Sequence, residues 1–281
     1  MMRKRLLLAL VAILPLTAWA GEDDDFGLWT SLGVTKNLPR NWSVDLEAEL
    51  RTEDNVRSVD RWSIGAGVNY RVNKYLKLGV AYNFLDKYSA DKTKYKDPDD
   101  NDEWTEGYNL YRHHWTPRHR ANFEVNAGLK LWKWLRISVR ERYQFTHTMA
   151  TDVDRLKYRV TPGEEHLVDI VDGQPVYEYG DPEITEKWDV KHYDASDTHY
   201  LRSRLKLEYD RKRCNWNPFV SVEFQNNLTD AMSLLKIRAM AGTEYKISKQ
   251  HSVYAAYVFN CETDDGNARS HAVSVGYAYE F

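Results

Sequence analysis

The sequence predicts an all-β protein, a transmembrane antiparallel up-and-down β-barrel of 10–12 strands. Apolar and polar residues alternate through most of the chain after residue 40, which is the pattern of strands with one apolar and one polar face. The alternating segments run for roughly 10 to 14 residues, whereas a tilted strand needs about 9 to 11 to cross a bilayer. Short turns on one side and longer loops on the other connect them, which is typical of outer-membrane barrels.

Composition fits a barrel with two different faces. The chain has 281 residues with 29% charged and 13% aromatic residues, including 10 Trp and 19 Tyr, and its mean hydropathy is −0.67. After the N-terminus no apolar run approaches the roughly 18 residues of a spanning helix. A polar average with many aromatics is expected when every second strand residue faces lipid and its neighbours are charged.

The first 20 residues predict a cleaved secretory signal. A basic start, an apolar core and an Ala-x-Ala motif occupy residues 3–5, 6–16 and 18–20, the order found in signal peptides. A membrane anchor is the alternative, but the core is short for one. We expect a single outer-membrane barrel domain over 21–281, located in the outer membrane.

The alternation defines eleven segments, of which the first is the weakest. They begin near residue 26 and end at Phe281, and the clearest alternation within each expected strand covers about 26–37, 42–51, 61–71, 76–84, 120–129, 135–145, 201–209, 220–225, 235–245, 253–259 and 273–281. Bacterial barrels have an even number of strands with both termini periplasmic. Eleven would begin the first strand outside, so the prediction stays at 10–12.

The connections sort by length. Short turns near 39–41, 73–74, 132–133, 211–216 and 248–250 are expected on the periplasmic side. Loops at 52–60, 87–117, 148–197, 228–233 and 261–269 are expected outside. Cys214 then lies in a short turn and Cys261 at the other end, across a wall about 25 Å tall. Because disulfide Cα atoms lie within about 7 Å, we predict no bond between them.

Aromatic residues gather at strand ends beside the short turns. They predict a girdle at the periplasmic interface, where amphipathic rings favour the headgroup level. Its members are Trp42, Tyr70, Tyr75, Trp132, Trp134, Trp216, Tyr245, Tyr279 and Phe281. The expected partners are outer-membrane lipids and the barrel assembly machinery, the latter because the last strand ending in Phe281 resembles the C-terminal signal of outer-membrane barrels. The oligomeric state is left open.

The predicted inward face is rich in charge. A basic wall comprises Arg118, Arg120, Arg136, Arg140, Arg142, Arg202, Arg204 and Lys206, and an acidic wall comprises Asp45, Glu47 and Glu49. In one interpretation the two walls interlock and fill a narrow lumen, since buried charges must pair or stay hydrated. In the other they form a narrow pore or a pathway for an anionic solute.

A lipid hydrolase is the enzymatic alternative. His147, His199, Ser203 and Glu141 would face lipid on adjacent strands. His199 and Ser203 are four residues apart on one strand, about 13 Å, whereas catalysis needs hydrogen-bond contact. No Gly-flanked serine motif accompanies them, so no catalytic residue is assigned and the protein is expected not to be an enzyme. A β-bulge turning Glu141 inward would explain a carboxylate on the lipid face.

The long loops suggest a structural or surface-binding barrel as another alternative. Residues 149–197 are acidic, and 168–177 read as a hairpin with an Asp-Gly turn. The acidic segment 97–106 has oxygen ligands that could hold Ca²⁺ but no ordered spacing. We therefore predict no metal and no cofactor, and no motif indicates nucleic-acid binding.

Four segments and the C-terminus carry a resemblance. The segments are Phe26-Gly27-Leu28-Trp29, the stretch 46–55, Arg118-His119-Arg120 and Arg140-Glu141-Arg142-Tyr143, and the chain closes on an amphipathic strand ending in Phe281. With these the sequence resembles an uncharacterised family of small Gram-negative outer-membrane β-barrels, a domain of unknown function. The resemblance implies the fold and the location, and nothing about mechanism.

Overall fold

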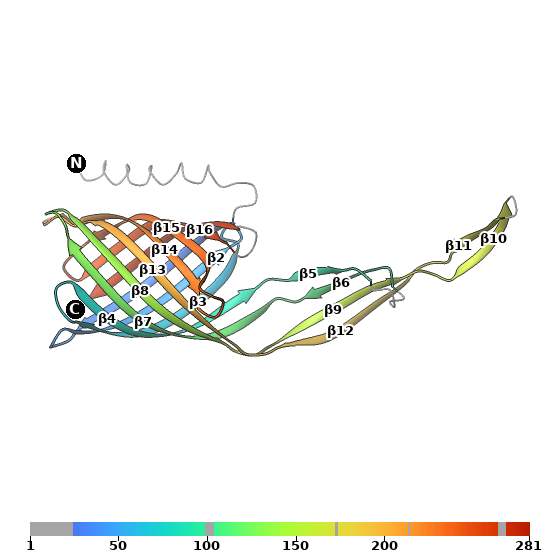
Figure 1. Ribbon diagram of the computed structural model, residues 1–281, viewed down its shortest axis with the longest axis horizontal. Coiled ribbons are helices and arrows are strands. Elements are labelled where there is room, and N and C mark those ends of the chain that lie inside the picture. Colours follow the sequence, from blue (N-terminus) through green and yellow to red (C-terminus); the bar gives the residue numbers. More distant parts are fainter. Residues whose placement is uncertain (1–24, 99–103, 172–173, 213, 264–267) are drawn as a thin grey trace. The chain divides into compact units, whose positions relative to one another are not determined.

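The computed structural model describes residues 25–98, 104–171, 174–212, 214–263 and 268–281. The predicted signal segment lies outside these residues. Seventeen strands form in the described chain, and eleven of them close into the barrel of Figure 1. No helix among the described residues is long and apolar enough to cross a membrane.

The barrel confirms the predicted fold class and a strand number within 10–12. Its strands, in chain order, are β1 (Asp25–Asn37), β2 (Trp42–Glu53), β3 (Ser58–Arg71), β4 (Leu76–Ser89), β7 (His114–Lys130), β8 (Leu135–Thr148), β13 (Ser196–Tyr209), β14 (Trp216–Asn227), β15 (Ser233–Lys246), β16 (His251–Glu262) and β17 (Arg269–Glu280). Their tilt around the barrel is visible in Figure 1.

A parallel seam explains the odd strand number. β1 and β17 pair in parallel, from Asp25 opposite Ser270 to Thr35 opposite Glu280. The other neighbouring pairs with a defined register are antiparallel. β1 can therefore close an eleven-stranded barrel, although β1 starts at one end of the barrel and β17 finishes at the other.

Compared with a soluble protein, the apolar and polar side chains of the barrel have exchanged places. Outward side chains are apolar and exposed, as at Leu32 (64%), Ile64 (58%) and Val80 (59%). Inward positions hold buried polar groups, such as Gln144 and Glu223. The apolar surface thus lies on the outside of the barrel, where a bilayer would cover it.

The two ends of the barrel differ in their connections. The short-turn end carries residues 38–41, 72–75, 131–134, 210–215 and 247–250, and the long-loop end carries the others. The predicted loop at 52–60 is wrong in length, since β2 reaches Glu53 and β3 starts at Ser58. Asp54, Asn55 and Val56 make this reversal with positive φ angles.

The segments predicted as the longest loops fold into a second compact unit, residues 88–116 and 149–195. One sheet joins β5 (Lys92–Lys96), β6 (Glu106–Tyr111), β9 (Thr151–Thr161) and β12 (Glu183–Tyr193). β10 (Glu165–Val171) and β11 (Gln174–Tyr179) pair antiparallel, which confirms the predicted hairpin strands; the Asp-Gly turn itself lies outside the described residues.

Candidate functional site

A cavity of about 930 Å³ lies inside the barrel. It reaches the short-turn end, where Asn73, Lys74 and Tyr75 of the β3–β4 turn line it. Its lining does not include Leu85 and Val258, inward residues nearer the long-loop end, which are 1% and 0% exposed. Within the described residues, the cavity therefore reaches the short-turn end, and these two buried side chains lie toward the long-loop end.

Small residues on β3 and β4 make room for the cavity. Gly65, Gly67 and Gly79 face inward there, together with Ala81. Because these four positions carry no large side chain, long side chains from β7, β8 and β13 have room to extend into the space opposite. Gly65 also lets the Asn83 side chain lie against the strand, where even a Cβ would overlap it.

The cavity is strongly basic. Thirteen Arg or Lys residues and six Asp or Glu residues line it, an excess of seven positive charges, whereas the whole chain has a formal charge of −3. Seven of the eight residues of the predicted basic wall line the cavity. Arg118 does not; it lies nearer the start of β7, and its buried Nε has no hydrogen-bond partner among the described residues.

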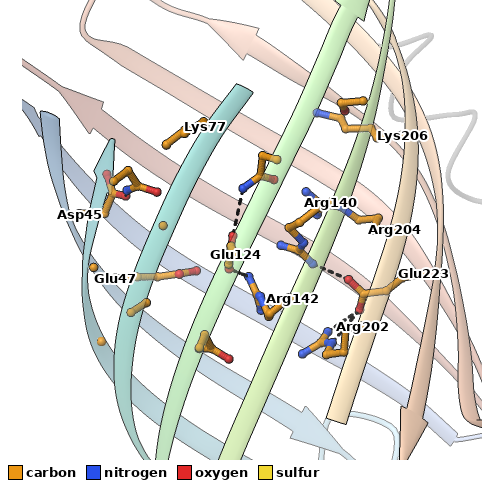
Figure 2. A pocket seen from close by; sticks show the side chains of 18 of the residues that line it. Asp45, Glu47, Lys77, Glu124, Arg140, Arg142, Arg202, Arg204, Lys206 and Glu223 are labelled. Carbon is orange, nitrogen blue, oxygen red and sulfur yellow. Dashed lines mark hydrogen bonds and ion pairs between the residues drawn. The ribbon is translucent and has the colours of Figure 1, made fainter. Parts of the chain in front are cut away.

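One carboxylate organises much of the basic wall. Glu223, on β14, pairs with Arg140 and Arg202, and the Nη1 of Arg238 lies 3.7 Å from its Oε1. Glu124, on β7, pairs with Arg142. Figure 2 shows Glu223 with Arg140 and Arg202, and Glu124 with Arg142, within the lumen. The predicted basic wall is therefore interlaced with two carboxylates, Glu124 and Glu223, that the predicted site did not include.

The three acidic residues predicted on β2 all line the cavity. Glu49 accepts hydrogen bonds from Arg51 at 2.7 and 2.8 Å, and Asp45 accepts one from Thr35 at 2.8 Å. Glu47 interacts electrostatically with Arg142 from the facing wall. Asp45 and Glu47 lie on the far side of the lumen from the arginines in Figure 2, so opposite charges face each other here.

Trp29 was absent from the predicted site. Two guanidinium groups lie over its ring, with central carbons 3.6 Å (Arg51) and 4.9 Å (Arg238) from the ring centroid. Such cation–π contacts hold the charges in fixed positions. The first strand is the weakest in the alternation pattern, and only the three-dimensional register brings its one inward tryptophan to β2 and β15.

The polar groups on the outward face do not form a serine–histidine pair. Ser203 donates to Glu141 at 2.6 Å, whereas His199 hydrogen-bonds to Tyr143 at 2.7 Å. His147 hydrogen-bonds to Asp197 at 2.7 Å. The predicted bulge at Glu141 is wrong, because the registers of β8 with both neighbours run through it without a shift. Its bond with Ser203 instead satisfies one oxygen on the outward face.

The residues of the predicted girdle lie at the short-turn end. Trp42 contacts Tyr70 and Trp216 contacts Tyr245, with ring centroids 4.8 and 4.9 Å apart. Trp132 stacks on Trp134, and Tyr279 stacks on Phe281. Tyr75 lines the mouth of the cavity. Cys214, also near this end, and Cys261 are both free thiols.

Ion pairs stabilise the sheet of the second unit. Asp189 of β12 accepts hydrogen bonds from Arg155 and Lys157 of β9, and these bonds hold the pKa of the Asp189 carboxyl well below its usual range. The hydrogen bond with Asp152 raises the pKa of His192. Residues 99–103 of the acidic segment considered for Ca²⁺ are outside the described chain, and the described residues contain no metal-binding group of three or more side chains.

Comparison with known proteins places the chain in a family. A solved structure described as "CymD monoaromatic hydrocarbon channel" is 11% identical, with a TM-score of 0.40 over 89% of this chain and 86% of its own. One described as "Outer-membrane expressed OmpT of Vibrio cholerae" is 12% identical, with a TM-score of 0.21 over 83% and 93%. No curated protein matches. The family model "Protein of unknown function (DUF2490)" matches residues 26–271, and the chain belongs to this family.

Proposed function

We propose that the protein is an integral outer-membrane barrel, without enzymatic activity, whose basic lumen is a pathway for anionic solutes. Support for the location comes from the outward belt of exposed aliphatic side chains and from the aromatic residues at the short-turn end. A barrel of this kind presents its short turns to the periplasm. The expected signal peptide agrees with export from the cytoplasm.

The excess of seven positive charges around the cavity carries the functional part of the proposal. A cavity lined by one sign of charge within low-dielectric walls concentrates counter-ions. Rings of Arg and Lys favour anions in pores. The space beside the glycine-lined wall leaves these cations accessible from the short-turn mouth.

Conductance across planar bilayers tests the pathway. With the purified, folded protein and a KCl gradient, we expect channels whose reversal potential indicates preference for chloride over potassium. Ala81→Phe, which fills the cavity, should lower the conductance. Val80→Phe, its outward-facing neighbour on the same strand, should leave it unchanged. Absence of channels above background would overturn the pathway.

A barrel with a plugged lumen, acting as a structural or surface-binding protein, is the second candidate. The packing of Leu85, Gln144 and Val258 at the long-loop end favours it, since each is at most 3% exposed. In that case the same preparation would be folded, as judged by heat-modifiable migration on gels, yet would give no channels. The acidic second unit would then be the part that contacts partners.

A further inference from the structure

Arginines face each other in two successive cross-strand pairs inside the barrel. Arg140 lies directly opposite Arg204, and Arg142 lies opposite Arg202, all on the inward faces of β8 and β13. Like charges directly opposite on neighbouring strands destabilise a sheet. Figure 2 shows the four side chains together with Lys206 on one side of the lumen. We call these four residues the arginine ladder.

The carboxylates of the barrel do not balance this ladder. Glu223 and Glu124 pair with three of its members, and Glu223 is shared further with Arg238. Arg204 forms no ion pair with any described carboxylate, although it lines the cavity. Arg120, on β7, also lines the cavity and forms no ion pair with a described carboxylate. Two glutamates therefore form the ion pairs of the ladder, which by itself carries four guanidinium charges.

Unsatisfied donors point to the same place. The Nε atoms of Arg120, Arg140 and Arg142 are buried and have no hydrogen-bond partner among the described residues. All three side chains line the cavity. A buried donor without an acceptor costs free energy, more so when it is charged. An acceptor that carries several oxygens and more than one negative charge would satisfy both the donors and the excess charge.

We infer that the arginine ladder, with Arg120 and Lys206, is a binding site for a multivalent oxyanion of the phosphate or sulfate class. Guanidinium groups bind such oxyanions with two parallel hydrogen bonds, which is stronger and more directional than contact with chloride. Because the cavity reaches the short-turn end, whereas Leu85 and Val258 are buried toward the long-loop end, the anion enters and leaves at the short-turn end.

The inference shares with the proposed function the premise that the lumen selects anions, but it does not require conduction. Calorimetric titration of the detergent-solubilised full chain with pyrophosphate, inorganic phosphate and sulfate tests it, with chloride at matched ionic strength as the reference. We expect saturable binding, strongest for pyrophosphate, that chloride does not reproduce.

Arg204→Gln is the informative variant, since it removes the ladder member that has no ion pair. We expect at least a tenfold loss of pyrophosphate affinity together with higher stability of the empty barrel, because a like-charge contact is relieved. Arg204→Lys keeps the charge but not the two-pronged geometry and should lose less. Arg118→Gln is the matched control, since Arg118 also faces inward but does not line the cavity, and it should bind as the unchanged protein does.

The outcomes separate the two proposals. Binding without conductance would leave the site intact and overturn only the pathway. Anion-selective conductance without saturable oxyanion binding would leave the pathway and overturn the site. Equal loss of affinity in Arg118→Gln and Arg204→Gln would also overturn the site, because it would reduce the effect to general charge.

Discussion

Glu223 neutralises several positive charges in the lumen. Its side chain is only 6% exposed, and its carboxylate lies within ion-pair distance of three guanidinium groups. Removing one partner of a buried ion pair leaves uncompensated charge. We expect Glu223→Gln to lower the free energy of unfolding by about 3–5 kcal/mol, measured by urea unfolding in detergent micelles. Glu208→Gln, nearer the mouth, loses the ion pair with Lys206 but keeps an oxygen that can accept the hydrogen bond from Asn217, and should cost less than about 1 kcal/mol. Similar losses would contradict the shared role of Glu223.

Glu141 is a carboxylate on the outward face of the barrel. A carboxylate facing lipid is unfavourable, though less so than Lys or Arg, so Glu141→Leu should raise the free energy of unfolding in lipid by about 1 kcal/mol. Ser203→Ala should lower it, because the variant removes the donor 2.6 Å from the carboxylate. Ser203→Ala should also leave the release of products from phospholipid unchanged. Release that is lost in Ser203→Ala would instead support the lipid-hydrolase alternative.

The sequence predicts which side chains face the lumen better than it predicts which of them form ion pairs with each other. Alternation alone predicted that Arg140 and Arg204 face the lumen. It could not predict that Glu223 passes over Arg204, its direct cross-strand neighbour, to bind Arg140 and Arg202. Such choices depend on side-chain geometry across three strands, which no local pattern records.

The seam between β1 and β17 depends on one glycine. A methyl group at Gly276 would overlap the Tyr254 ring and lie 2.5 Å from the Ser31 Oγ, so Gly276→Ala should lower stability by about 1–3 kcal/mol through overpacking. Gly33→Ala is the control in the same seam, because its nearest neighbour would be 3.9 Å away. Heat-modifiable migration across a temperature series measures both. Equal tolerance would show that Tyr254 can move aside.

The β9–β12 pair carries a pH-dependent contact. Asp152 accepts a hydrogen bond from His192, and Asp194 adds a weaker attraction while Lys191 opposes it, so the pKa of His192 is above its ordinary value of 6.5. The contact therefore contributes fully below pH 6.5 and is lost as the pH rises through the folded-state pKa. NMR titration should give a lower pKa in Asp152→Asn, and a smaller decrease in Asp194→Asn. An unchanged His192 pKa in Asp152→Asn would contradict this.

Elements differ in how well the sequence predicts them. The barrel strands were predictable because a lipid-facing side forces strict alternation, as from Trp42 to Arg51. Apart from the β10–β11 hairpin, the strands of the second unit were read as loops, because β5 is rich in Lys and the apolar face of β12 is interrupted by Glu186 and His192. The parallel direction of the seam has no local signal at all, since the same alternation serves either direction.

For the whole molecule, the proposed orientation in the outer membrane is testable with its own thiols. In Cys261→Ser, Cys214 is the remaining cysteine and lies in the β13–β14 turn at the short-turn end. A membrane-impermeant maleimide should label it only after the cells are permeabilised. Thr229→Cys in a chain with both native cysteines replaced by Ser should be labelled in intact cells. The reverse pattern would invert the barrel.

We expect the parallel seam to form last when the barrel folds. Hairpins such as β1–β2 form between strands that are close along the chain, but the seam joins residues as distant as Asn37 and Glu280, which are 243 positions apart. Bringing such distant segments together carries the largest loop-closure entropy of the barrel. Until that last step, β1 and β17 each present an unpaired edge, which is a template for unwanted pairing. The time these two edges stay open is therefore the period in which the chain is most exposed to aggregation.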